Sequence, residues 1–182
     1  SSLATTQAWY GIWNNGGSSA YLSMSNNTFT NNTTNATSGT TYLMYNTGAV
    51  ASYNTMSNNN FSFSHVGATG YTGTLYNLYN AGSTITTTLS INGNNFSSYN
   101  HTTTGTGIIY FIYNTASSYV LGYTNNFIGN LNMNHSGSEY CIYNSTSTQY
   151  SLSVISNSIT NITRNAAAGT MYCYYAGSSS LP

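Results

Sequence analysis

The sequence predicts an all-β chain wound into a parallel β-solenoid, and three observations support this fold class. A Tyr-x-x-Tyr-Asn motif, varied near both ends of the chain, recurs after 32, 34, 34, 30 and 32 residues. An Asn-x-Phe or Asn-x-Ile motif follows each of the first five copies, and a glycine precedes the first tyrosine by three residues in the last five. Three markers that repeat in one order indicate a single structural unit stacked many times rather than a globular domain.

The segments between these markers have the pattern of short strands. Leu22–Ser25 and Leu89–Asn92 place apolar residues at every second position, which is the period of a strand. Thr, Tyr, Val and Ile favour strands, Gly, Asn and Ser interrupt them, and the only proline is Pro182. We therefore expect one domain over residues 1–182, a segment of a longer array or a filament subunit. Its roughly 5.5 coils of about 30–35 residues would stack to about 26 Å.

The strand period assigns faces to the tyrosine motif. Its third position is apolar or aromatic in every copy and should point inward, which sends the first position inward as well. The second position, which ranges from Gly11 to Phe111, is too varied for a core, and the fourth should stack on the outer surface. The inward tyrosine ladder is expected at Tyr10, Tyr42, Tyr76, Tyr110, Tyr140 and Tyr172. The candidate surface ladder is Trp13, Tyr45, Tyr79, Tyr113, Tyr143 and Tyr175.

Asparagine forms two further columns. An amide carries a donor and an acceptor, so side chains stacked at coil spacing can donate to the coil above and accept from the coil below. Because asparagine tolerates a left-handed backbone, we interpret both columns as corner ladders that hold the register. The first comprises Asn14, Asn46, Asn80, Asn114 and Asn144, and the second comprises Asn27, Asn59, Asn94, Asn125 and Asn157. The fourth coil is short, which predicts a bulge or a tighter corner between Tyr119 and Asn125.

Charge is nearly absent. Arg164 is the only basic residue and Glu139 the only acidic one, whereas soluble domains average about a quarter charged residues. Such a surface has no field to attract nucleic acid or anionic lipid, and no apolar run approaches the ~20 residues that span a membrane. We therefore expect neither nucleic-acid binding nor membrane insertion.

Catalysis and metal binding are disfavoured by residue type. General acid–base chemistry needs paired titratable groups and calcium sites need several carboxylates, but Glu139 has no second carboxylate. His65, His101 and His135 have different offsets in their coils, so we expect them in turns or on the surface. A Ser-His-Glu triad through His135 and Glu139 is formally possible but has nothing to orient it. Arg164 is expected in a solvated loop, and no enzyme activity, cofactor or metal is predicted.

Two kinds of covalent modification stay open. Cys141 and Cys173 occupy equivalent positions 32 residues apart, so they should be neighbours in adjacent coils, either bridged or reduced. Asn-x-Ser/Thr sequons are frequent, as expected for a chain so rich in Asn, Ser and Thr. Those in the variable stretch after the second motif are the candidate glycosylation sites: Asn31, Asn32, Asn35 and Asn100.

The repeats at Leu22–Phe29 and Val154–Ile162 resemble those of right-handed parallel β-helix proteins of the pectin-lyase-like kind. They resemble still more the long tandem-repeat β-helix proteins of bacterial surfaces, and the resemblance covers nearly the whole chain. It implies a right-handed coil and an extracellular or cell-surface location on a bacterium, with an adhesive or structural role. The enzymatic relatives cut acidic polysaccharides with clustered aspartates and basic residues, which this sequence lacks.

Three functions follow as hypotheses. The first is a structural or adhesive extracellular fibre element, because a solenoid cut between coils exposes strand edges that another copy or the continuing chain can extend. The alternative is a carbohydrate-binding surface on the outer tyrosine ladder. The third, ice binding, needs a regular threonine array, and residues 86–88 have no counterparts one period away. The expected partners are therefore further copies, end to end or along a filament, and glycans.

Overall fold

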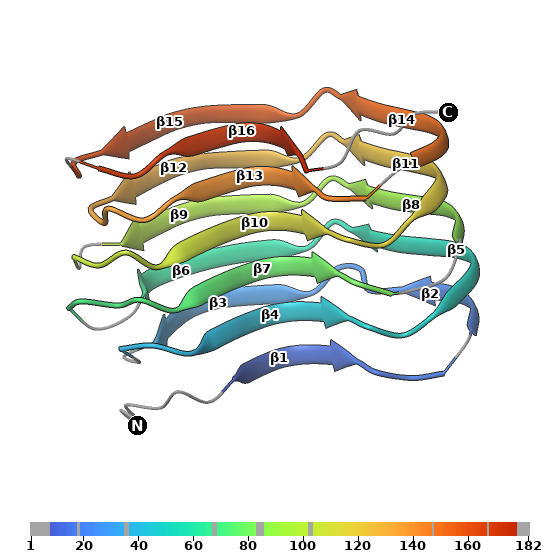
Figure 1. The fold of residues 1–182 in the computed structure, drawn as a ribbon, viewed down its shortest axis with the longest axis horizontal. Coiled ribbons are helices and arrows are strands. Elements are labelled where there is room, and N and C mark those ends of the chain that lie inside the picture. The colour runs from blue at the N-terminus through green and yellow to red at the C-terminus, as the bar shows by residue number, and fades with distance from the viewer. Residues whose placement is uncertain are drawn as a thin grey trace.

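The computed structural model describes residues 8–17, 19–34, 37–66, 69–82, 86–101, 104–146, 148–166 and 168–177. Within these ranges every regular element is a β-strand and every strand pair is parallel. Figure 1 shows the strands stacked in layers, with each coil lying on the one before it. The predicted β-solenoid is confirmed, with about five coils.

Three parallel sheets form the walls of the solenoid, and we name them A, B and C. Sheet A has six strands: β1 (Trp9–Asn14), β4 (Thr40–Asn46), β7 (Thr74–Asn80), β10 (Ile108–Asn114), β13 (Glu139–Asn144) and β16 (Met171–Ala176). Sheet B has five: β2 (Ser19–Ser23), β5 (Val50–Ser57), β8 (Thr86–Asn92), β11 (Ser118–Thr124) and β14 (Thr148–Ile155). Sheet C has five: β3 (Thr28–Thr34), β6 (Asn60–Val66), β9 (Asn95–His101), β12 (Phe127–Met133) and β15 (Ser158–Arg164).

The pairing register places equivalent motif residues above one another. Tyr76 pairs with Tyr42 in the coil below and with Tyr110 in the coil above. A strand that pairs with its own repeat aligns like side chains in columns, which is why the sequence period shows so clearly. The core is filled by such columns from all three sheets, among them Leu78, Phe111, Leu89, Leu121, Phe96 and Leu131.

The predicted faces of the tyrosine motif are wrong at its first two positions. The second position is buried, because Leu43, Asn77 and Phe111 have no exposed surface. Leu43 and Met44 are consecutive and both buried, so the alternation of β4 is interrupted between the second and third positions. This interruption turns both tyrosine columns outward. The tyrosines expected inside that instead lie on the outer face are Tyr10, Tyr42, Tyr76, Tyr110, Tyr140 and Tyr172.

The second asparagine column contains Asn126 and not the predicted Asn125. Asn94 donates its Nδ2 to Asn126 Oδ1 at 2.9 Å, and Asn126 is buried. Asn125 is the residue before it and has a left-handed backbone with φ of 55°. The corner and the ladder are therefore made by neighbouring residues, because one turns the backbone while the next stacks. The left-handed residue of the other coils is Asn26, Asn58, Gly93 or Ser156.

The stretch from Tyr119 to Asn125 does not shorten the fourth coil relative to the third, because β11 pairs with β8 without a shift in register. Pairing of β11 with β14 does shift register between Ser118 and Val120, at the beginning of that stretch. One difference from the third coil comes earlier. Ser118 pairs with Thr86, but it follows the last residue of β10 by four positions, whereas Thr86 follows the last residue of β7 by six. The connection from β10 to β11 is thus two residues shorter. The connection from β12 to β13 is shorter as well, because Glu139 follows Met133 by six positions whereas its partner Ile109 follows His101 by eight.

A glycine column lets the backbones of successive coils approach closely before sheet A. A Cβ built on Gly73 or Gly137 would overlap the carbonyl oxygen of the glycine one coil below. Among the glycines of this column only Gly39 and Gly169 have positive φ, so the shared requirement is the close approach.

Candidate functional site

The outer face of sheet A carries two columns of aromatic side chains, which we call the tyrosine face. Rings of the first column stack with centroids 4.7–5.1 Å apart and planes within 12° of parallel. Each also contacts the second-column ring of its own strand, as Tyr42 does Tyr45 at 4.5 Å. The predicted surface ladder is thus only half of the array. The tyrosine face comprises Tyr10, Trp13, Tyr42, Tyr45, Tyr76, Tyr79, Tyr110, Tyr113, Tyr140, Tyr143, Tyr172 and Tyr175.

The second column changes orientation halfway along. Tyr79 and Tyr113 meet edge to face, with centroids 4.6 Å apart and planes at 86°. Above this break the rings of Tyr113, Tyr143 and Tyr175 stack on one another within 24°. Because stacked rings cover each other's faces, the break is the place in this column where a ring face meets the edge of its neighbour.

Burial raises the pKa of several phenols on the tyrosine face. It raises the pKa of Tyr42 to about 12, and the neighbouring phenols of Tyr45 and Tyr10 add to the shift. Burial also raises the pKa of Tyr76 and Tyr110, again with support from adjacent phenols. These three phenols therefore stay neutral up to strongly alkaline pH.

The first amide ladder runs unbroken through sheet A from β1 to β13. Nδ2 of each asparagine donates to Oδ1 of the next coil, at 2.7 Å from Asn14 to Asn46 and at 3.2 Å from Asn114 to Asn144. The two links between them, through Asn80, measure 2.8 and 2.9 Å. All five predicted residues are present, and the ladder stops where Ala176 pairs with Asn144.

The second amide ladder is more densely bonded. Nδ2 of Asn94 donates both to Met56 O in the coil below and to Asn126 Oδ1 in the coil above, each at 2.9 Å. The main-chain N–H of Asn94 also donates to Asn126 Oδ1, at 3.0 Å. Asn27 and Asn59 make the same link upward. Each inner coil is therefore tied to both neighbours through one buried amide.

Two further buried amides were not predicted from the sequence. Asn77 has no exposed surface and donates to Tyr110 O at 3.1 Å. Asn54 occupies a column that is otherwise leucine and donates to Asn80 Oδ1 at 3.2 Å. Only their positions in the register, opposite apolar residues, could have marked them.

The only acidic and the only basic residue of the chain contact each other inside the molecule. Arg164 Nε lies 3.1 Å from Glu139 Oε2, and His135 Nε2 lies 2.9 Å from Glu139 Oε1. The side chain of Glu139 is fully buried and that of Arg164 is 21% exposed. The expected solvated loop for Arg164 is therefore wrong. Its guanidinium also donates to three main-chain carbonyls, those of Gly137, Ala168 and Gly169.

Two histidines belong to this cluster, which corrects their expected place in turns or on the surface. His101 and His135 are buried and stack with centroids 4.2 Å apart and planes at 11°. His101 pairs with Met133 in the coil above, and His135 follows Met133 by two residues. The two rings therefore meet although the histidines occupy different positions in their coils. The side chain of His65 lies outside the described residues.

The His135 ring is fixed by both of its nitrogens. Nδ1 accepts from the Gly137 main-chain N–H at 3.2 Å, so Nε2 is the nitrogen that donates to Glu139. Neither nitrogen is left to take a proton from a serine hydroxyl, as the formal triad would require. We call His101, His135, Glu139 and Arg164 the ionic cluster, and its contacts are those of a structural tie between β13, β15 and the turns beside them.

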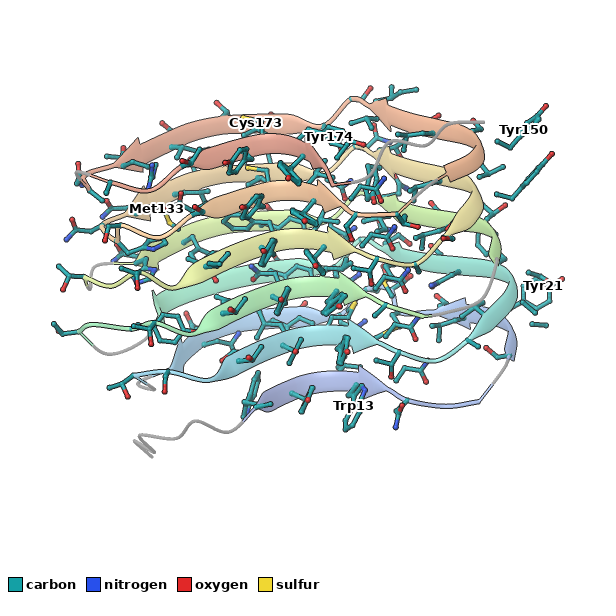
Figure 2. The ribbon with its side chains drawn as sticks, in the orientation of Figure 1. Trp13, Tyr21, Met133, Tyr150, Cys173 and Tyr174 are labelled. Atoms are coloured by element: carbon teal, nitrogen blue, oxygen red, sulfur yellow. The ribbon has the colours of Figure 1, made fainter. Side chains whose placement is uncertain are left out.

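The two cysteines are neighbours in sheet A, as predicted, and both are free thiols. Their neighbours Tyr140 and Ile142 pair with Tyr172 and Tyr174, so Cys141 faces Cys173. Cys141 is buried, and Cys173, which Figure 2 labels on β16, is exposed. Burial raises the pKa of the Cys141 thiol well above its usual range, and the adjacent Cys173 and Glu139 add to this. A buried thiol with raised pKa is a poor nucleophile.

The candidate glycosylation residues differ in exposure. Asn31 and Asn100 are exposed and Asn32 is half-buried. Asn35 lies outside the described residues. Asn100 also accepts a hydrogen bond from Asn132 Nδ2 at 3.0 Å.

Both ends of the solenoid leave apolar columns uncovered. Leu152 is 40% and Val154 43% exposed, whereas their partners one coil below, Leu121 and Tyr123, are fully buried. At the other end Ile12 is only half-buried, although Met44 above it has no exposed surface.

The amide ladders are open at the same ends. Asn27 Oδ1 has no coil below to donate to it, and no coil above accepts from the main-chain N–H and the second Nδ2 hydrogen of Asn157 among the described residues. The two ends thus carry complementary groups, an acceptor at the β3 end and donors at the β15 end.

No described helix is long and apolar enough to cross a membrane, and the described residues contain no group of three or more potential metal ligands among His, Cys, Asp and Glu. Comparison of the sequence with family models, with curated proteins and with solved structures gives no match. The chain's own geometry offers three candidate sites, namely the tyrosine face, the ionic cluster and the two open ends.

Proposed function

We propose that the chain is a structural, non-catalytic element of an extracellular fibre, extended at its ends by further β-solenoid coils. The observation that carries this proposal is the state of the two end coils. Their apolar columns end in side chains that are not covered, namely Leu152 and Val154 at one end and the half-buried Ile12 at the other. Exposed apolar side chains beside unpaired strand edges favour association with another strand layer.

Complementarity of the ends supports extension in one direction. A further coil above Asn157 would take the same place that Asn157 takes above Asn126, where Oδ1 accepts from both the N–H and Nδ2 below. The next coil, from the continuing chain or from a second copy, would therefore be added with its strands parallel to those beneath.

The surface chemistry fits an extracellular structural role on a bacterial cell. Asn, Ser and Thr dominate the chain, its formal net charge is zero, and no charge repulsion opposes self-association. Exposed sequons such as Asn31 and Asn100 would allow glycans to keep such a rod soluble. Adhesion would then use the sides of the rod.

Sedimentation velocity and negative-stain microscopy over a range of concentrations test this function. We expect rods of constant width that grow only in length. Leu152→Glu should suppress growth, because it places a charge on the open end of an apolar column. Tyr150→Glu is the matched control, because Tyr150 is 71% exposed on the same strand and projects away from the body in Figure 2. Particles that stay at single-domain length at every concentration would contradict assembly from further copies.

A carbohydrate-binding surface is the second candidate, and the break in the tyrosine face favours it. A sugar ring stacks on an exposed aromatic face, and the rings of Tyr79 and Tyr113 lie nearly perpendicular to each other. Parallel stacking elsewhere covers ring faces and stabilises the sheet instead.

A glycan array separates the two roles of the tyrosine face. Replacing Tyr79 and Tyr113 with serine should abolish binding if sugars stack at the break. The double variant Tyr119→Ser with Tyr150→Ser removes a comparable stacked pair on sheet B, with centroids 4.6 Å apart, and should bind as the parent chain does. Equal binding by all three chains, or none by the parent, excludes this candidate.

A further inference from the structure

Among the described residues, sheet A has one strand more than sheets B and C. Its sixth strand, β16, lies on β13, whereas β14 and β15 end their sheets one level lower. Figure 1 shows β16 at the upper end of the layer formed by β1, β4, β7, β10 and β13. The upper end of the described solenoid is therefore a step and not a flush face.

This step prevents a second copy from fitting directly onto β16. If β1 of a second copy paired with β16, its β2 and β3 would lie two levels above β14 and β15, with no described strand of either copy at the level between them. A vacant level is about 4.8 Å high and would leave the edges of both strands unpaired. The apolar side chains of Leu152 and Val154 would stay uncovered as well.

The sequence of β16 departs from the repeat at the positions that join coils. Ala176 stands where the lower coils have asparagine, so the first amide ladder ends at Asn144. Tyr174 occupies the column of Ile12, Met44, Leu78, Ile112 and Ile142 and is 37% exposed. Figure 2 labels Cys173 and Tyr174 on this last strand of sheet A.

Strand β1 has the residues that this place lacks. Set on β13, it would put Asn14 Oδ1 above Asn144 Nδ2 and Ile12 above Ile142, as the register of β1 with β4 shows. Strands β2 and β3 would then follow directly onto β14 and β15. Leu22 belongs to the column of Leu152, and Asn27 Oδ1 would meet the open donors of Asn157.

We propose that the partner at this end is a second copy docked through β1–β3 onto β13–β15, and that β16 is a cap which must leave before docking. The inference rests on the proposed end-to-end assembly and adds its direction, its register and its control. Two ring stacks hold the cap, Tyr172 on Tyr140 at 4.7 Å and Tyr175 on Tyr143 at 4.8 Å. Release of β16 exchanges these contacts for the corresponding contacts of the incoming β1.

Two full-length variants change the stability of β16 on β13 in opposite directions. Tyr172→Ser with Tyr175→Ser removes both ring stacks, and Tyr174→Ile with Ala176→Asn restores the repeat and strengthens docking of β16 on β13. The control, Tyr119→Ser with Tyr150→Ser, removes one stacked pair on sheet B, outside the junction. All chains carry Cys173→Ser, so that Cys141, buried in β13, is the only thiol.

Three measurements follow the replacement of β16 by the β1 of a second copy. Maleimide labelling of Cys141 reports opening of β16 in the monomer, and sedimentation gives the concentration at which rods form. Hydrogen exchange of residues 171–176 compares β16 in monomers and in rods. We expect the loosened variant to label roughly thirtyfold faster and to form rods at a roughly thirtyfold lower concentration, since the two ring stacks contribute about 1 kcal/mol each. The strengthened variant should shift both in the other direction, and the control neither.

Hydrogen exchange decides the inference independently of the variants. Residues 171–176 should be protected in monomers and exchange freely in rods. Protection of β16 within parent rods, or rod formation at one concentration for all variants, would overturn the cap while leaving end-to-end assembly intact. Failure of every chain to form rods, the loosened variant included, would overturn both.

Discussion

The amide of Asn94 shows how much one side chain contributes in a solenoid. Asn94 donates to the coil above through both its main-chain N–H and its Nδ2, and Nδ2 also donates to the coil below. Its Oδ1 accepts two hydrogen bonds from Asn59. Alanine cannot replace any of the side-chain bonds and leaves buried groups unpaired on both sides. The amide is thus a tie between three coils.

We expect Asn94→Ala to lower the free energy of unfolding by about 3 kcal/mol or more, because each buried group left unpaired costs roughly 1–3 kcal/mol. Asn132→Ala is the control. It removes an exposed amide pair with Asn100 and should cost less than about 1 kcal/mol. Urea unfolding followed by far-ultraviolet circular dichroism measures both. Equal costs would show that the buried ladder has no special role.

The ionic cluster makes a second prediction for single residues. Glu139→Gln removes the carboxylate between Arg164 and His135 and leaves a partly buried guanidinium without a counter-charge. We expect a loss of about 3 kcal/mol, as for other buried ion pairs broken on one side. Adding Arg164→Met should restore part of this stability, because no uncompensated charge then remains.

Urea unfolding of the single and double variants measures that recovery. A double variant less stable than Glu139→Gln alone would mean that Arg164 acts mainly through its bonds to the carbonyls of Gly137, Ala168 and Gly169.

The strands show which parts of the fold a sequence period can predict. Columns such as Asn46, Asn80 and Asn114 were predictable because a solenoid pairs each residue with its own repeat. Side-chain direction within the strand was not, since consecutive burial of Leu43 and Met44 breaks the period of two that assigns faces. A local break of this kind changes no repeat length and leaves no trace in the spacing.

The same limit explains the asparagine corner and the ionic cluster. Asn125 and Asn126 are adjacent and chemically identical, and only the left-handed φ of Asn125 separates their roles. His101, His135, Glu139 and Arg164 occur once each rather than in every coil, so no repetition marked them as neighbours. The sequence thus predicted the fold and its columns, but not the one site that has no repeat.

Sheet A as an element has a predictable response to alkaline pH. The pKa of Tyr42 rises from its ordinary 10.0 to about 12 in the folded chain, chiefly because of burial. Above pH 10 the unfolded chain therefore binds fewer protons than the folded one, and stability falls as pH rises. The stabilisation is fully present below about pH 10 and is lost progressively through about pH 12.

Unfolding in urea at a series of pH values, with phenolate absorbance recorded in parallel, measures this loss. The triple variant Tyr42→Phe, Tyr76→Phe and Tyr110→Phe is the control, because it keeps the stacked rings and removes three hydroxyl groups with raised pKa. It should lose less stability between pH 10 and 12. An identical loss of stability in parent and variant would show that these three hydroxyl groups do not cause it.

The whole molecule is a linear stack in which a coil contacts only its neighbours. An end coil has one neighbour, so it should open before the centre does. The only two tryptophans, Trp9 and Trp13, both lie on β1 at the lower end, as the label of Trp13 shows in Figure 2. Tryptophan emission therefore reports one end of the molecule.

We expect the tryptophan transition at a lower urea concentration than the transition seen by circular dichroism. A central reporter supplies the control: Tyr119→Trp in a chain with Trp9→Phe and Trp13→Phe places the probe on β11, which is paired on both sides. Its transition should coincide with circular dichroism. Coincidence of all three curves would show that the solenoid unfolds as one cooperative unit.

The common orientation of the two buried amide ladders has a consequence for a molecule with no net charge. Every link between ladder residues sends its N–H toward the β16 end, from Asn14 to Asn46 and from Asn27 to Asn59 alike. Dipoles aligned head to tail add, as peptide dipoles do along a helix. The stack therefore has an electrically positive pole and a negative pole. Such rods would turn to line up in an applied electric field, and longer ones more strongly.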